Sequence, residues 1–163
     1  MHTGEIECLE RRMLSDVTPN ASIASVRAFR SPVRWLGVFA RDQLQDLRHI
    51  QRPFALVFNT DPSNKPGKHW LSIFGPNDGP LEFFNSFGMP PSYYGLTSSF
   101  TYLLISFQSY TSDMCINYTL YFIYYRSRNI SFIKIISLIK FILVPDTHVK
   151  NYVLFFTKSI LFN

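Results

Sequence analysis

The chain has 163 residues and a formal net charge of +5; 47% of its residues are hydrophobic and only 17% are charged. This length suits one domain of about 100–150 residues, and the composition excludes intrinsic disorder, which requires low hydrophobicity and high net charge. Two cysteines, Cys8 and Cys115, lie far apart, which excludes a disulfide scaffold and a cysteine-rich zinc site. We expect no metal and no cofactor.

The start of the chain carries scattered charges and no apolar run of the kind found in a secretory signal peptide. After Gln108, the longest charge-free apolar piece is Met114–Tyr125, with twelve residues, whereas a bilayer-spanning helix needs about 20. We therefore expect no membrane span and an intracellular protein, in the cytoplasm or the nucleus. We also expect a monomer.

The first half of the chain divides into an arm and the beginning of a folded domain. Residues 1–34 are polar, mixed in charge and interrupted by prolines, and are predicted to form an N-terminal arm. The domain is predicted to span 35–163. It begins with the apolar run Trp35–Phe39, after which Leu44 and Leu47 repeat at helical spacing and predict a helix.

Short strands are predicted next. Ala55–Asn59, His69–Phe74 and Leu81–Phe84 are rich in Val, Phe and Ile and are separated by loops containing Pro and Gly, so they predict a β-meander. Tyr102–Phe107 is predicted to form a fourth strand.

Helices are predicted in the last third of the chain. Cys115–Tyr125 is predicted to be a buried helix. In 132–142, Lys134, Ser137 and Lys140 recur every three positions, which favours a helix, although the isoleucines also suit a strand. Asn151–Phe162 is predicted to form another helix, separated by Pro145. The sum is an α+β domain.

Four separated residues carry the candidate chemistry. His69 opens the second strand of the meander and Asn85 follows the third, so antiparallel pairing is expected to bring the two side chains together. Gln108 precedes Cys115 by seven residues, with the polar turn SYTSD between them. Cys115 is placed at a helix N-terminus, where backbone N–H groups and the helix dipole favour a thiolate.

This arrangement predicts a thiol protease. His69 is assigned as general base, Asn85 as acceptor of the other imidazole N–H, and Gln108 with the Cys115 backbone N–H as oxyanion donors. The pKa of Cys115 is expected to be lowered. For each residue taken alone, a purely structural role is the simpler interpretation, because buried cysteines and histidines packed beside tryptophan are common.

Four sequence blocks resemble those of one protease family. The chain is similar to the adenovirus endopeptidase (adenain) family, in the version carried by Maverick/Polinton DNA transposons and related viruses. The resemblance rests on GVFARDQL, NTDPSNKPGKHW, EFFNSFGMPP and QSYTSDMC, found at Gly37–Leu44, Asn59–Trp70, Glu82–Pro91 and Gln108–Cys115. The order His, acid or amide, Gln, Cys is shared with SUMO-specific proteases.

The resemblance implies a fold and a function. The fold would be α+β, with a central, mostly antiparallel sheet and the catalytic Cys115 at a helix N-terminus. The activity would be endoproteolysis of viral or transposon precursor polypeptides near small residues, notably glycine. It also implies an activating peptide and DNA as accessories, and possible association with virions.

Three positions depart from the family pattern. The family usually has Asp or Glu at Asn85, Gly at Ile116 and, commonly, His at Asn117. Ile116 is expected to crowd the substrate or shift the oxyanion N–H. These changes leave a second hypothesis open, in which the domain is catalytically impaired and acts as a binding module or is a non-functional mobile-element remnant.

Two further interpretations use the charge and the aromatic content. The net charge and the 17% aromatic residues allow weak nucleic-acid binding, although a solvated basic surface and an aromatic core explain both. A membrane-surface role for 129–144 is the least favoured. Cys8 is interpreted either as an idle thiol or as a tether for a partner.

Overall fold

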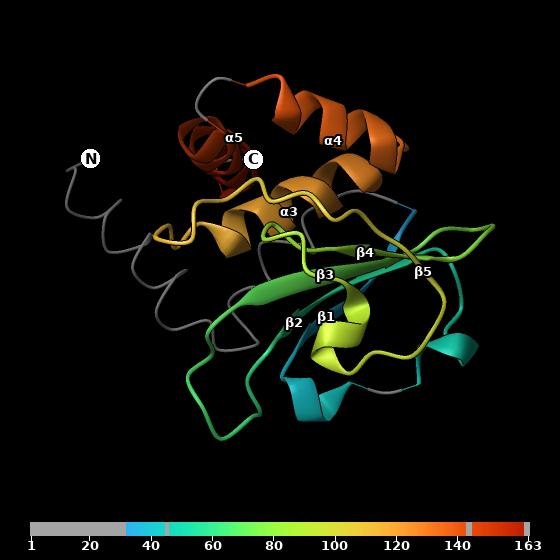
Figure 1. Cartoon of the computed structure of the whole chain (residues 1–163). Coiled ribbons are helices and arrows are strands. Elements are labelled where there is room, and N and C mark those ends of the chain that lie inside the picture. The colour runs from blue at the N-terminus through green and yellow to red at the C-terminus, as the bar shows by residue number, and fades with distance from the viewer. Residues whose placement is uncertain (1–31, 45, 143–144, 162–163) are drawn as a thin grey trace.

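The computed structural model in Figure 1 describes residues 32–44, 46–142 and 145–161. These residues form a five-stranded sheet with three α-helices, α3, α4 and α5, on one side of it (Figure 1). The predicted α+β class is therefore confirmed. Most of the predicted arm, including Cys8, lies outside the described residues.

The sheet has the strand order β1-β2-β3-β4-β5. Its strands are β1 Arg34–Phe39, β2 Phe54–Asn59, β3 Trp70–Gly75, β4 Leu81–Phe84 and β5 Phe100–Thr101. Strands β2, β3 and β4 pair in antiparallel fashion, which confirms the predicted meander. The pairs β1–β2 and β4–β5 are parallel, so the sheet is mixed and the expectation of a mostly antiparallel sheet is wrong.

The helix predicted from Leu44 and Leu47 does not form. Two short 3-10 helices occur instead, η1 Arg41–Gln43 and η2 Leu47–His49. Leu44 is extended, with φ −67° and ψ 117°, so the first turn ends there. The second turn starts afresh because the Asp46 side chain accepts a hydrogen bond from the backbone of Arg48. The apolar run before η1 becomes the edge strand β1.

The prediction of a fourth strand at Tyr102–Phe107 is also wrong. Only Phe100–Thr101 pairs, as β5. Further along, the backbone N–H of Phe107 donates to the carbonyl of Ser86, which lies just after β4. The segment is thus held by a loop contact, and its alternating pattern does not correspond to a strand ladder. The 3-10 helix η3 Pro91–Tyr94 lies between β4 and β5.

The helices follow the predictions more closely. α3 Cys115–Arg126 matches the predicted buried helix, and α4 Phe132–Lys140 settles the helix-or-strand choice in favour of a helix. The Ser131 hydroxyl caps α4 by accepting from the Lys134 backbone N–H. α5 Pro145–Leu161 begins six residues before the predicted start, because Pro145 occupies its first turn, where a missing N–H costs nothing.

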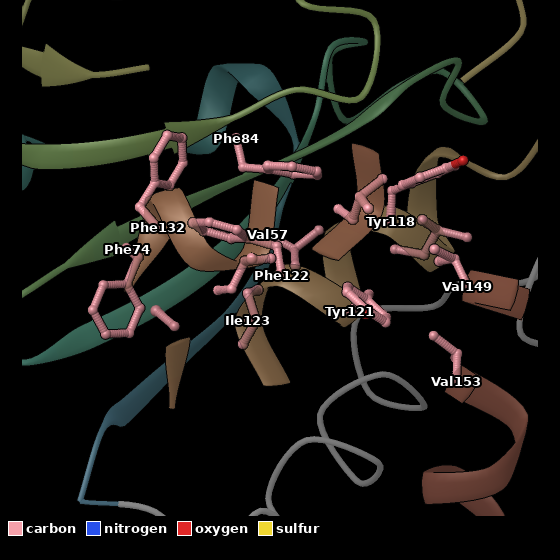
Figure 2. Close-up of a cluster of buried hydrophobic side chains, with 14 of the residues drawn as sticks. Val57, Phe74, Phe84, Tyr118, Tyr121, Phe122, Ile123, Phe132, Val149 and Val153 are labelled. Carbon is pink, nitrogen blue, oxygen red and sulfur yellow. The ribbon is translucent and has the colours of Figure 1, made fainter. Parts of the chain in front are cut away.

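Both faces of the sheet are buried. On one face, side chains of β2, β3 and β4 pack beneath α3, α4 and α5 (Figure 2). Phe84 stacks on Phe122 of α3 with ring centroids 4.7 Å apart. On the other face, alternate residues of the same strands pack against η2 and the segment around Tyr94. Because the strands are covered on both sides, β2 is buried along its whole length.

Among the residues that the structure describes, no helix is both long and apolar enough to cross a membrane.

Candidate active site

A loop anchored by Asn59 places His69 at the start of β3. The Asn59 side-chain oxygen accepts from the backbone N–H groups of Asp61 (2.7 Å) and Lys68 (3.3 Å). Gly67 packs directly on this amide with φ +96°, and an added Cβ would lie 2.2 Å from Asn59 Nδ2. Only glycine fits both the positive φ and this close approach. The loop 60–68 is thereby closed onto the end of β2.

His69 and Asn85 meet as the antiparallel register of β3 and β4 predicts. His69 Nε2 lies 2.8 Å from Asn85 Oδ1, and the two residues are 8% and 5% exposed. His69 immediately precedes β3 and Asn85 immediately follows β4. Because the two strands are antiparallel, both residues lie at the same end of the strand pair.

The hydrogen bonds around Asn85 fix the orientation of its amide. Oδ1 also accepts the backbone N–H of Phe87 (2.9 Å), whereas Nδ2 donates to the carbonyl of Met89 (3.1 Å) and to the hydroxyl of Tyr94 (3.0 Å). Because the atom facing His69 is an acceptor, Nε2 must carry the imidazole proton. In the neutral ring the lone pair therefore resides on Nδ1.

His69 is held neutral and has one unsatisfied nitrogen. Burial lowers the pKa of His69, and the hydrogen bond to Asn85 opposes this effect only in part. The Phe87 ring covers the imidazole at a centroid distance of 4.5 Å. Nδ1 is buried and has no hydrogen-bond partner among the described residues. A buried nitrogen with a free lone pair is available to accept a proton.

Cys115 is the first residue of α3 and lies beside the backbone of Trp70. The backbone N–H of Trp70 interacts with the thiol, and Thr119, one turn further along α3, donates its hydroxyl to the Trp70 carbonyl at 3.1 Å. The helix is thus fixed to the strand residue next to His69. The candidate nucleophile, Cys115, therefore contacts Trp70, the residue next to the candidate base, His69.

The electrostatics of Cys115 differ from the prediction. Burial of the thiol, which is in a residue only 6% exposed, raises its pKa above the ordinary value. The N–H groups of Trp70, Ile116 and Cys115 lower the pKa, but burial outweighs them, and the charge of Asp113 adds to the increase. The expected lowering is therefore wrong: burial favours the neutral form of both the Cys115 thiol and the His69 imidazole, and no hydrogen bond joins the two, since His69 Nδ1 has no partner among the described residues.

Gln108 is buried and held at both ends of its amide. Ser86 donates its hydroxyl to Oε1 at 2.7 Å, and Nε2 donates to the carbonyl of Ser112 at 2.6 Å. An amide nitrogen has two hydrogens, so a second N–H remains for a further acceptor. Gln108 also braces the loop that leads into α3.

Ile116 and Asn117, which depart from the family pattern, are both buried. Ile116 is 8% exposed and belongs to the hydrophobic cluster beneath α3, so its side chain contributes to the core, and the expected crowding of substrate stays a prediction. Asn117 is also buried, and its Oδ1 has no hydrogen-bond partner among the described residues.

Sequence reasoning missed three residues that support the site. Ser86 and Phe87 lie in the block EFFNSFGMPP that carried the resemblance, so their position next to Asn85 was a usable signal. Tyr94 gave no signal, because it reaches Asn85 through the fold of η3. A pocket of about 150 Å³ adjoins Trp70 and is lined by residues of β1, η1 and the loop 60–68.

No protein-family model matches the chain, and no curated protein matches it. The described residues contain no cluster of three or more His, Cys, Asp or Glu side chains able to hold a metal ion.

Proposed function

We propose that the protein is a cysteine endopeptidase that uses Cys115, His69, Asn85 and Gln108. The observation that carries the proposal is the imidazole of His69. Asn85 keeps the imidazole proton on Nε2, and the buried Nδ1 of His69 has no partner among the described residues. The thiol of Cys115 contacts the backbone N–H of Trp70, the residue that follows His69.

The first half of the reaction begins with proton transfer. His69 Nδ1 takes the proton of Cys115 as the sulfur attacks the scissile carbonyl carbon, so charge develops only with substrate bound. The C–S bond forms and the carbonyl electrons move to oxygen. The Cys115 backbone N–H and the second N–H of Gln108 stabilise that oxyanion, and one such donor is worth about 10²–10³ in rate.

The second half releases both products. The tetrahedral intermediate collapses, the C–N bond breaks, and the imidazolium gives its Nδ1 proton to the leaving amine. The thioester then reacts with water, which loses a proton to His69. The sulfur leaves, is reprotonated, and the carboxylic acid product departs.

The substrate class rests on the resemblance to adenain-like proteases. We propose precursor polypeptides cleaved near small residues such as glycine, with a viral or transposon protein as the natural substrate. A peptide activator, DNA and an intracellular location follow from the same resemblance.

The test is cleavage of glycine-containing peptide libraries, read by mass spectrometry, for the wild type, Cys115→Ala and His69→Ala. We expect cleavage by the wild type only, and a mass increase on Cys115 when the acyl-enzyme is trapped. His49→Ala is the matched control, because His49 is exposed and lies outside the site. Equal cleavage by wild type and Cys115→Ala would overturn the proposal.

Alkylation of Cys115 tests the proposed activity less directly than peptide cleavage does. Because burial raises the pKa of Cys115, its reaction with iodoacetamide should be slow at neutral pH and should still be increasing at pH 9.0, the ordinary thiol value. Slow alkylation at neutral pH is therefore compatible with an active enzyme in which His69 removes the proton only during attack.

A second candidate function is peptide binding without turnover. The raised pKa and the burial of Cys115 favour it. It predicts that glycine-containing peptides bind equally to wild type and Cys115→Ala, with no product from either.

A further inference from the structure

Helix α4 presents apolar side chains to solvent on its outer side. Ile133, Leu138 and Phe141 are 63%, 38% and 85% exposed. The inner side of the same helix is fully engaged in the core, through Phe132, Ile135, Ile136 and Ile139. α4 therefore has apolar side chains on both sides, and those of its outer side lie outside the core.

Two lysines accompany these side chains. Lys134 and Lys140 lie on the exposed side of α4, and neither belongs to an ion pair among the described residues. The sequence has no Asp or Glu between Asp113 and Asp146, a stretch that includes all of α4. We call the three apolar residues and the two lysines the α4 outer face. All the charges on this face are positive.

The position of α4 leaves this face accessible. Figure 1 shows α4 on the side of α3 that is turned away from the sheet. Cys115 lies at the beginning of α3, whereas α4 follows the other end of that helix. A partner on the α4 outer face would leave the Cys115 site uncovered.

We propose that the α4 outer face binds the surface of an anionic lipid bilayer. Apolar side chains flanked by lysines are the composition of interfacial helices, which lie in the headgroup region with their apolar side inserted. Lysine stems extend along apolar surface and keep the charge among the headgroups. The helix has nine residues, so it lies on the bilayer and does not span it.

Two other partners fit this surface less well. Nucleic acid would pair with the lysines, but the aliphatic Ile133 and Leu138 offer neither stacking nor hydrogen bonds to bases or phosphates. A second copy packed face to face would bring Lys134 and Lys140 of both copies together, and like charges in such an interface are unfavourable. A surface with both acyl chains and negative headgroups matches all five residues.

The test is co-sedimentation of the full chain with phosphatidylcholine vesicles, with or without phosphatidylserine. We expect binding only when phosphatidylserine is present, and a loss that increases with salt. Phe141→Asp should weaken binding at least about tenfold by removing the most exposed apolar contact. Lys134→Gln and Lys140→Gln should each weaken it about fivefold, as expected for one cation near an anionic surface.

Controls separate insertion from general charge. Leu104→Asp is the matched variant, because Leu104 is 67% exposed but lies between β5 and α3, and its binding should equal that of the wild type. Phe141→Trp should show fluorescence quenching by lipids brominated in the acyl chain. The inference does not depend on proteolytic activity, so these assays are independent of it.

Several results would overturn the proposal. One is equal vesicle binding by Phe141→Asp, Leu104→Asp and wild type. Another is binding that responds to the lysines but shows no quenching at Phe141→Trp, which would indicate a purely electrostatic contact. A third is a dimer in lipid-free solution that Phe141→Asp dissociates, which would make the face an interface between copies. A fourth is a duplex DNA affinity that Phe141→Asp abolishes.

Discussion

A buried group of polar side chains lies at each end of helix α3. In the group at the C-terminal end, the closed centre, the polar groups are hydrogen-bonded; in the group at the N-terminal end, the open centre, one nitrogen has no partner among the described residues. At the C-terminal end of α3, Arg126 forms a salt bridge of 2.6 Å with Glu82 of β4, and the two side chains are only 11% and 12% exposed. The remaining donors of Arg126 reach Glu82 Oε1 and the carbonyl of Ile130, and its guanidinium lies over the Phe74 ring. Every strong donor in this centre has a partner.

At its N-terminal end, the centre around Cys115 is left open. His69 Nδ1 has no partner among the described residues, and the thiol remains protonated because burial outweighs the nearby N–H groups. The same strand, β4, serves both centres, through Glu82 within it and Asn85 just after it. A closed polar network stabilises the packing of helix on sheet, whereas an open one keeps a lone pair and a proton available for reaction.

The largest effect is expected at the closed centre. Arg126→Met should lower the free energy of unfolding by about 3–5 kcal/mol, because it leaves the Glu82 carboxylate buried without a partner. Urea denaturation measures this change. The double variant Arg126→Met with Glu82→Leu should regain most of the stability.

A matched control is available for this prediction. Arg48 forms a pair of the same length with Asp46, but its side chain is 74% exposed, so Arg48→Met should leave the urea midpoint unchanged. If Arg126→Met proved as mild as Arg48→Met, the closed centre would not be a stabilising element.

The next effect is expected at the open centre. Asn85→Ala removes the acceptor of the His69 Nε2 proton, so the productive tautomer is no longer favoured and a buried N–H loses its partner. We expect kcat/KM to fall about 10- to 100-fold. Peptide cleavage measures the loss, and a thermal melt reports any loss of folding. A kcat/KM equal to that of the wild type would remove Asn85 from the mechanism.

Asn85→Asp tests the same position through pH. Burial holds the pKa of His69 below 6.5 in the wild type, so its base form persists below that pH. A carboxylate beside the ring favours the imidazolium and raises that pKa. Because the base form is required, the acid limb of kcat/KM against pH should move to higher pH in Asn85→Asp. A shift to lower pH would contradict the assignment of His69 as base.

Local sequence patterns predict some features of these two centres and not others. The meander and the His69–Asn85 contact follow from short strands, turn residues and the period of two, so the sequence suffices for them. The direction of the Cys115 pKa shift does not follow from the helix N-terminus alone, since burial contributes the larger effect. Burial is a property of the packed helix, which no local pattern records.

The same limit applies to the two incorrect elements. Leu44 and Leu47 repeat at helical spacing, but the Asp46 side chain starts a new turn between them and divides the segment. Tyr102–Phe107 alternates like a strand but meets the loop after β4, where Ser86 accepts its backbone N–H. In both segments the hydrogen bonds that form lie outside the periodic pattern, so the pattern does not record them.

The smallest effect is expected at Tyr94, which reaches the open centre from η3. Its hydroxyl accepts one of the Nδ2 hydrogens of Asn85 at 3.0 Å, so it helps to keep Oδ1 directed at His69. In Tyr94→Phe the Met89 carbonyl still holds the amide, and we expect kcat to fall only about fivefold, the value of one hydrogen bond. Tyr93→Phe is the matched control, because Tyr93 is adjacent but 67% exposed, and its kcat should be unchanged. Tyr94 contacts Asn85 and not the substrate, so KM should stay constant while kcat falls; a change confined to KM would show that Tyr94 binds substrate instead of orienting Asn85.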